Sequence, residues 1–424
     1  MTTDSFHAVD FDYTRTELHG PMLIEASAGT GKTFSLERII LRLIVEEDEN
    51  GTAVGLDHLL LVTFTNAATS ELRMRVRQTL RNVLRTWNTL LQGKTPNEKV
   101  DSLIQGWFDA AEIVRRSNEP NRTKEAVNDW HRRVKKRLED ACHVIDVAAI
   151  YTIHAFAQKL LKEFSLSCDG FAERQILQDA ELESIKADLL DNYLREHLPS
   201  DNPSLLKEIL QYTEVGEAFK DLGREKPEYI RTLTVKKLTS EETKDNKKGA
   251  EKATALSPEA KVWFTKLFTT FPGLLSERLR RLGYATHDGM LLELLGYLRE
   301  QSGHPDQNGG SFIDTVRTRY RAVLIDEFQD TDPVQYEIFK ILFLDAKSCR
   351  TPPSDKIFFV GDPKQAIYSF RSAELETYLL AKKNIRVVKS LSINYRSTPS
   401  LIGVFNRFFS SEAAFQMSEA SFPT

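Results

Sequence analysis

The segment from Ala26 to Thr33 combines residue types whose spacing can bind the phosphates of a nucleotide. Two glycines would let backbone N–H groups close around phosphate oxygens, and a following helix would add the positive end of its dipole. Lys32 would reach the β and γ phosphates of ATP, and the Thr33 hydroxyl would bind Mg²⁺. A glycine-rich turn without a ligand is the alternative. The loop reads Ala26, Ser27, Ala28, Gly29, Thr30, Gly31, Lys32 and Thr33, with alanine where this motif usually begins with glycine.

A pair of carboxylates, Asp326 and Glu327, follows the apolar run Ala322–Ile325. Carboxylates at the carboxyl end of a buried strand stand where α/β sheets bind ligands. Asp326 would hold Mg²⁺, and Glu327 would position or deprotonate an attacking water. An acidic turn after a core strand is the alternative for the pair alone. Beside a phosphate loop, the two carboxylates predict hydrolysis of ATP.

These residues need a scaffold, which short apolar runs alternating with helical patterns predict. Continuous apolar strands separated by helices indicate a parallel sheet covered on both faces, the α/β class. The segment from Thr33 to about Val45 predicts a mostly buried crossover helix. Two long stretches with helical patterns, at about 87–140 and 169–284, interrupt the alternation. The expected strands are Met22–Glu25, Leu59–Thr63, Val147–Thr152, Ala322–Ile325, Ile357–Val360 and Arg386–Leu391.

The composition of the 424 residues excludes several classes of protein. A chain with 41% hydrophobic and 28% charged residues is typical of a globular protein, not of a disordered or collagen-like one. No apolar run approaches the roughly 18 residues of a membrane span, so we expect no membrane partner. Three cysteines are too few for a disulfide framework or a zinc site, which favours the cytoplasm. The net charge of −4 excludes a uniformly basic coat but allows a local basic groove.

Longer motifs resemble those of the superfamily 1 DNA helicases of the UvrD/Rep type. The resemblance covers the chain from Leu23 to about Ile402, with the motifs in the order of that family. Their residues are most similar to those of the RecB branch, the beta subunits of exodeoxyribonuclease V. AddA and UvrD proteins usually carry a glutamine ahead of the phosphate loop, and Phe11–His19 contains none. The motifs are Leu61–Val76, Tyr151–Phe156, Asp326–Tyr336, Val360–Arg371 and Ile393–Thr398.

The resemblance implies a RecA-like P-loop NTPase domain with an α-helical insertion, and a DNA-dependent ATPase that moves 3′→5′ on single-stranded DNA. Gln365 would sense the γ-phosphate, Arg396 would contact it, and Tyr395 would stack on the adenine. Gln329 would belong to the same nucleotide-sensing network. Phe34 stands where UvrD-type enzymes have an arginine that faces the adenine. The residues expected to be catalytic are Lys32, Asp326, Glu327, Gln365 and Arg396.

The resemblance also implies a path for single-stranded DNA. Phe64, Tyr368 and Phe370 would flank or stack on bases, which tolerates any sequence because every base has a π-face. Core packing is the alternative for the aromatic residues, and a structural role is the alternative for the histidine named below. The residues that would contact the DNA backbone are Thr63, Thr65, Thr152 and His154.

A basic cluster at Arg132–Arg137 lies in the first helical stretch, with further basic residues upstream. Such a cluster could follow DNA phosphates. Acidic residues are interleaved with it, so a solvated helix face is the alternative.

By resemblance the chain has three parts and several partners. Residues 1–86, 141–168 and 284–395 would form the ATP-binding motor domain, residues 87–140 and 169–283 the helical insertion, and residues 396–424 the start of a second motor domain. The family's later motifs and the nuclease domain of RecB and AddA are missing, so we expect the chain alone to bind ATP but to lack unwinding and nuclease activity. The implied partners are DNA, including duplex ends at double-strand breaks, and RecC-like and RecD-like subunits. A nucleotide-binding scaffold subunit and a fragment of an AddA- or UvrD-type helicase are the alternatives.

Overall fold

In the computed structural model of the chain, the residues fall into two compact units. The first comprises Met1–Phe156 and Glu300–Thr424, and the second comprises Ala157–Arg299. Each unit is described by itself. The ranges that the structure describes are 9–48, 51–96, 99–115, 120–163, 174–214, 257–303, 312–347, 351–352, 356–366, 375–385 and 387–409.

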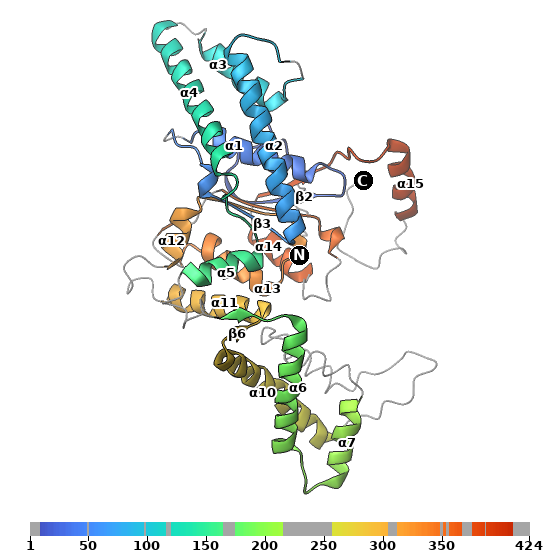
Figure 1. Cartoon of the computed structure of the whole chain (residues 1–424). Coiled ribbons are helices and arrows are strands. Elements are labelled where there is room, and N and C mark those ends of the chain that lie inside the picture. The colour runs from blue at the N-terminus through green and yellow to red at the C-terminus, as the bar shows by residue number, and fades with distance from the viewer. Residues whose placement is uncertain are drawn as a thin grey trace. The chain divides into compact units, whose positions relative to one another are not determined.

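The first unit is built on a sheet whose strand order is β1-β9-β2-β8-β7-β3-β4 (Figure 1). Every strand pairing recorded for the described residues of this sheet is parallel. The central strands are apolar and buried along their length, as in a parallel sheet that helices cover on both faces. The strands are β1 Val9–Asp10, β2 Gly20–Ala26, β3 Leu59–Thr63, β4 Ile150–Thr152, β7 Ala322–Ile325, β8 Lys356–Gly361 and β9 Val387–Leu391.

Helices cover both faces of this sheet (Figure 1). On one face, Ile24 and Phe358 share a buried core with Ile40 of α1. On the other face, Phe359 lies 4.7 Å from the ring of Phe328. Neighbouring residues of β8 enter different cores because side chains alternate across a strand. The α-helices of this unit are α1 Lys32–Val45, α2 Asn66–Leu91, α3 Ser102–Arg115, α4 Pro120–Val144, the start of α5 Ile153–Glu163, α12 Phe312–Arg319, α13 Pro333–Phe339, α14 Leu375–Asn384 and α15 Pro399–Phe409. The short 3₁₀ or π helices are η1 Leu56–His58, η4 Phe328–Asp330, η5 Lys340–Leu344 and η6 Pro363–Gln365.

The loops that follow the strands gather at one edge of the sheet. Because the pairings are parallel, the carboxyl ends of neighbouring strands lie side by side. Glu25 of β2 is opposite Gly361 of β8, and β7 is the next strand. Farther along the same edge, Thr63 of β3 is opposite Thr152 of β4. This is the edge at which α/β sheets bind their ligands.

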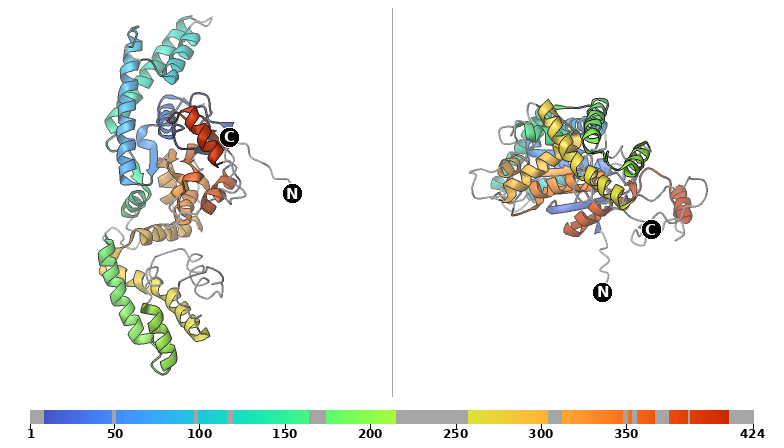
Figure 2. Two further views of the ribbon diagram at one scale, coloured as in Figure 1. Left: turned by 90° about the vertical axis from the view of Figure 1, so that its right-hand side faces the viewer. Right: turned by 90° about the horizontal axis from the view of Figure 1, so that it is seen from below.

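The helices α2, α3 and α4 lie next to one another (Figure 2), and residues of α3 and α4 pack around Trp87 of α2. Trp87 is fully buried, and its ring lies 4.6 Å from that of Phe108. Leu138 of α4 belongs to the same core as α1 and the sheet. Because of this packing, residues 87–140 cluster with the first unit. That they belong to one insertion together with residues 169–283 stays a prediction.

The second unit is mostly helical, with a short pair of parallel strands. Its core gathers apolar side chains from α6, α7 and α10, and Phe264 and Phe271 are fully buried. The Ser257 hydroxyl caps the start of α10, and Gly283 ends that helix in the left-handed conformation. The elements are β5 Gln175–Ile176, α6 Asp179–His197, α7 Pro203–Glu214, α10 Pro258–Leu282, β6 Tyr284–Ala285 and α11 His287–Gly303, whose last turn belongs to the first unit.

The predicted α/β class is confirmed, and each predicted strand has a counterpart: β3 and β7 have the predicted bounds, and the other four have shifted ends. The largest shift is in β4, which begins at Ile150 and not at Val147, because Val147 donates its N–H to Val144 in a turn. The strand β1 escaped prediction because two residues carry no periodicity. Among the described helices, none is long and apolar enough to cross a membrane.

Candidate nucleotide-binding site

The loop between β2 and α1 turns back on itself at two glycines. Gly29 has a φ of 82° and Gly31 a φ of 86°, in the left-handed region that other residues rarely adopt. The buried Thr30 hydroxyl donates to the Ser27 carbonyl oxygen at 2.8 Å and closes the turn. Because α1 begins at Lys32, its first backbone N–H groups lie beside this loop, an arrangement that suits a phosphate group.

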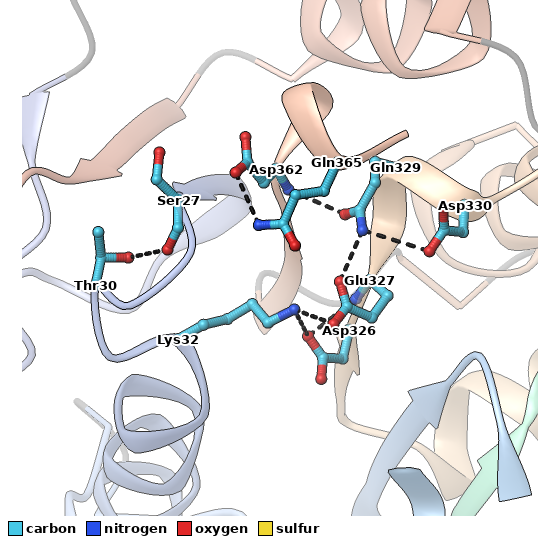
Figure 3. Close-up of polar contacts among 9 residues, drawn as sticks. All are labelled: Ser27, Thr30, Lys32, Asp326, Glu327, Gln329, Asp330, Asp362 and Gln365. Atoms are coloured by element: carbon cyan, nitrogen blue, oxygen red, sulfur yellow. Dashed lines mark hydrogen bonds and ion pairs between the residues drawn. The ribbon is translucent and has the colours of Figure 1, made fainter. Parts of the chain in front are cut away.

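The side chain of Lys32 reaches the two carboxylates that follow β7 (Figure 3). Its ammonium lies 3.5 Å from Asp326 Oδ1 and forms an ion pair with Glu327 Oε1. Burial raises the pKa of Asp326, and the positive charge of Lys32 opposes that rise. The structure thus brings together the lysine and the two carboxylates that the sequence placed in one site.

A line of hydrogen bonds runs from Glu327 to the loop after β8 (Figure 3). Gln329 Nε2 donates to Glu327 Oε2 at 2.7 Å, and Gln329 Oε1 accepts the Asp362 N–H at 2.9 Å. Asp362 Oδ2 in turn accepts from Gln365 Nε2 at 2.9 Å. Glu327 has a φ of 52°, and no other non-glycine residue in the described ranges has a positive φ. The two glutamines predicted to sense the nucleotide therefore belong to one network with the carboxylates.

Asp330 adds a buried carboxyl to this network. Its Oδ2 accepts a long hydrogen bond of 3.4 Å from Gln329, and its buried Oδ1 has no hydrogen-bond partner among the described residues. Burial and the negative charge of Glu327 raise the pKa of Asp330 to about 6. We did not single out Asp330 from the sequence, because burial of one carboxyl in an acidic turn leaves no sequence pattern.

The chain that follows β9 lies against the phosphate loop. The Tyr395 N–H donates to the Gly29 carbonyl oxygen at 2.8 Å, and Asn394 Nδ2 donates to the Ala28 carbonyl oxygen at 3.0 Å. A Cβ at Gly29 would lie 2.7 Å from Arg396 Cβ, so only glycine allows this approach. The structure thus places the predicted Arg396 and Tyr395 beside the loop, and the ring of Tyr395 is exposed.

The residues at this edge fit a magnesium ion that is bound together with a nucleotide. The Asp326 carboxylate and the Thr33 hydroxyl offer oxygen ligands, the type that Mg²⁺ prefers. Thr33 lies in the first turn of α1, which begins beside the same loop. In the described ranges, no group of three or more His, Cys, Asp or Glu side chains could hold a metal ion.

A comparison with protein families identifies the family to which this fold belongs. The family model described as "UvrD/REP helicase N-terminal domain" matches residues 12–114 and 121–386, most of the chain. The chain belongs to the UvrD/REP helicase family. The resemblance predicted from the motifs is confirmed.

Curated relatives of this UvrD/REP family chain carry the name RecBCD enzyme subunit RecB. The Escherichia coli K12 protein is 27% identical over 98% of this chain and 40% of its own length. The Mycobacterium tuberculosis H37Rv protein is 30% identical over 92% of this chain and 30% of its own length. The Chlamydia pneumoniae protein is 26% identical over 93% of this chain and 42% of its own length. The chain thus spans less than half the length of these relatives.

The threonines that we expected to contact DNA in this helicase-family chain have structural partners. Thr63 is buried, and its hydroxyl lies 2.6 Å from that of Thr69. The hydroxyls of Thr65 and Thr152 accept backbone N–H groups at the start of α2 and α5, as helix N-caps do. These hydrogen bonds are enough to explain why threonine stands at the three positions. That these threonines contact DNA stays a prediction.

Of the four remaining predicted DNA contacts, two lie in the described ranges and two do not. Phe64 directly follows β3 and is half-buried, and His154 lies half-buried in the first turn of α5. Both stand at the carboxyl edge of the sheet, as the motif assignment requires. Tyr368 and Phe370 lie outside the described residues.

The basic cluster on α4 is largely engaged in ion pairs. Arg133 and Arg137 both bind Glu47, which lies beyond α1. The Arg133 guanidinium lowers the pKa of Glu47. Arg132 pairs with Asp129 on its own helix. These pairs favour the solvated helix face over a DNA-binding stretch.

Two residues at the end of β8 and in the following loop were not predicted from the sequence. Gly361 packs against Gln329 so tightly that a Cβ there would lie 2.7 Å from Gln329 Oε1. Lys364 Nζ donates to Ser27 Oγ of the phosphate loop at 2.8 Å. The family resemblance implied a role for Gln365 in the motif Val360–Arg371. Gly361 and Lys364 belong to the same motif, but the resemblance implied no role for them.

Proposed function

We propose that the chain carries the ATP-binding motor domain of a RecBCD-type helicase, a DNA-dependent ATPase that moves 3′→5′ on single-stranded DNA during double-strand-break repair. The observation that carries this proposal is the meeting of Lys32, Asp326 and Glu327 at the carboxyl edge of a parallel sheet. The family membership and the relatives named RecB support it.

ATP binding would rearrange the ion pairs of this site. Lys32 now pairs with Glu327, and a nucleotide would draw the ammonium onto its β and γ phosphates. Glu327 would then be released to accept a proton from the attacking water, while Gln329 keeps hold of its other oxygen. A bound Mg²⁺, held by Thr33 and Asp326, would neutralise charge on the phosphates.

The remaining roles are proposed on the positions of their residues. Gln365 would sense the terminal phosphate through the Asp362 network. Arg396 would contact that phosphate, and the exposed Tyr395 ring would stack on the adenine. Phe64 would stack on a base, and Thr63, Thr65, Thr152 and His154 would contact the DNA backbone at the same edge.

The partners of the chain are proposed as DNA and RecC-like and RecD-like subunits, on the strength of the relatives named RecBCD enzyme subunit RecB. Residues 396–424 are proposed as the beginning of a second motor domain. In support, α15 leaves Leu401 and Val404 exposed, 45% and 62% respectively, an apolar face that a further domain would bury.

Nucleotide binding and turnover by two variants test the proposal. Lys32→Ala should abolish binding of a fluorescent ATP analogue, because it removes the cation that reaches the phosphates. Glu327→Gln should bind the analogue yet hydrolyse ATP roughly a hundredfold or more slowly, in the presence of single-stranded DNA. Lys347→Ala, a surface cation between η5 and the amino end of β8, is the matched control and should behave like the parent.

Two results would decide against this function. Hydrolysis of ATP by both site variants at the parent rate would mean that the site is assigned wrongly. Tight binding of ATP by the parent without any turnover, with or without DNA, would favour the nucleotide-binding scaffold over the motor.

A further inference from the structure

The loop after β8 places a second lysine on the phosphate loop. Lys364 lies in η6, and its ammonium donates to Ser27 Oγ at 2.8 Å. The two loops meet because β8 and β2 are neighbours in the sheet, with Glu25 opposite Gly361 at their carboxyl ends. Ser27 is the second residue of the loop, two positions before Gly29, at which the chain turns back.

Hydrogen bonds within the protein fix the backbone around Lys364 without a bound ligand. The Lys364 N–H donates to Asp362 Oδ1 at 3.1 Å, and Asp362 is 4% exposed. The Asp362 N–H is itself bound by Gln329. Pro363 restricts the turn further, since its ring fixes φ. The side chain of Lys364 is exposed.

The neighbouring Gln365 points elsewhere. Its amide donates to Asp362 Oδ2 at 2.9 Å, within its own turn. The adjacent Lys364 side chain, by contrast, donates to the phosphate loop. Lys32 pairs with both carboxylates of the site.

We propose that Lys364 is a second phosphate-binding lysine, whose ammonium exchanges Ser27 Oγ for a terminal phosphate oxygen of a nucleoside triphosphate. The inference rests on the proposed function and adds a residue to its site. A bond between an ammonium and a phosphate is charge-assisted and stronger than one to a neutral hydroxyl, so the exchange is favourable. Lysine suits this role as a point charge on a flexible stem.

The exchange would make the loop after β8 sensitive to the terminal phosphate. The turn that carries Lys364 is joined through Asp362 and Gln329 to Glu327. With a triphosphate bound, Lys364 would bind the terminal phosphate and shift this turn toward the nucleotide. With a diphosphate bound, Lys364 would stay hydrogen-bonded to Ser27. Lys364 would thus discriminate between the two nucleotides.

Affinities for ATPγS and ADP, each measured with Mg²⁺ on the purified chain, test this inference. Lys364→Gln should weaken ATPγS binding roughly 10- to 100-fold, the range expected for one hydrogen bond to a charged group. The same variant should change ADP binding less than about twofold. Lys364→Arg keeps the charge and should recover part of the ATPγS affinity. Lys347→Gln is the matched control for loss of a surface cation.

The comparison of the two nucleotides separates phosphate binding from anchoring of the loop. Loss of an anchor would weaken ATPγS and ADP alike, whereas loss of a contact to the terminal phosphate would weaken ATPγS. Equal weakening of ATPγS and ADP by Lys364→Gln, or no weakening of either, would overturn the inference while the proposed function stands. A parent chain that binds neither nucleotide would instead refute the proposed function and this inference together.

Discussion

The side chain of Gln329 holds the backbone of Asp362, with Oε1 accepting the Asp362 N–H at 2.9 Å. Gln329 comes from the turn after β7, and Asp362 begins the loop after β8. The same amide donates from Nε2 to Glu327 at 2.7 Å, so both of its ends are used. One buried glutamine therefore joins the carboxylates of the site to the loop that carries Lys364 and Gln365.

Gly361→Ala should disrupt the packing of Gln329 against the end of β8. The new Cβ would lie 2.7 Å from Gln329 Oε1, 3.1 Å from the Gln329 backbone nitrogen and 3.2 Å from that of Phe328. Since two of these atoms are backbone, the loop must move, and we expect a loss of about 1–3 kcal/mol in the free energy of unfolding. ATP hydrolysis should fall as well. Gly296→Ala, where nothing lies within 4 Å of the added Cβ in helix α11, should leave stability unchanged or raise it. Denaturant unfolding of both variants provides the comparison, and a Gly361→Ala protein as stable and active as the parent would contradict the tight contact.

Asp330 should make the stability of the chain depend on pH. Its pKa is raised to about 6 from the ordinary 3.8, chiefly by burial. Between these values the folded chain holds a proton that the unfolded chain has lost, so the contribution of Asp330 to folding becomes less favourable as pH rises from about 4 through 6. Asp330→Asn retains an oxygen acceptor for Gln329 without this titration. The free energy of unfolding of the parent minus that of the variant should thus fall between pH 4 and 7. A difference that is constant or rises with pH would show that Asp330 is not held in this way.

Phe64→Ala should weaken binding of single-stranded DNA, if the proposed DNA path is right. Loss of one aromatic stacking partner corresponds to about 1–3 kcal/mol, or roughly 5- to 150-fold in affinity for an oligo-dT probe. Phe64→Tyr should retain most of the affinity because it keeps the ring. Met74→Ala on the exposed side of α2, where Met74 is 65% exposed, is the control and should bind as the parent does. Anisotropy titrations at one fixed salt concentration measure all three, and unchanged binding by Phe64→Ala would remove this residue from the path.

Arg73→Lys should destabilise the turn that leads into β4. Arg73 Nη1 donates to the carbonyl oxygens of Ile145, Asp146 and Ala148, and Nη2 donates to that of Ile150. A lysine ammonium cannot reproduce this fork, and carbonyl groups left without donors would cost about 1–3 kcal/mol. Arg75→Lys is the matched control on the same helix, because the half-exposed Arg75 pairs with the carboxylates of Glu71 and Glu37 and not with a fork of backbone carbonyls. Melting temperatures should separate the two variants, and equal small losses would contradict a special role for Arg73.

The sequence by itself determined the elements and the residue types of the site. Apolar runs predicted the central strands to within a few residues, and the loop from Ala26 to Thr33 predicted a phosphate site between a strand and a helix. Both signals are local, since strand propensity, glycine content and motif spacing are properties of neighbouring residues. The same motifs were sufficient to predict the family.

Only the tertiary structure decided which loops meet. Insertion of β8 between β2 and β7 brings Lys364 onto Ser27 and Gln329 onto Asp362, contacts between residues that no local pattern relates. Burial in the assembled site raises the pKa of Asp330, and ion pairs with Glu47 occupy the basic residues of α4. Strand order and burial arise from the packing of the whole chain, so they lie beyond what a local sequence pattern can predict.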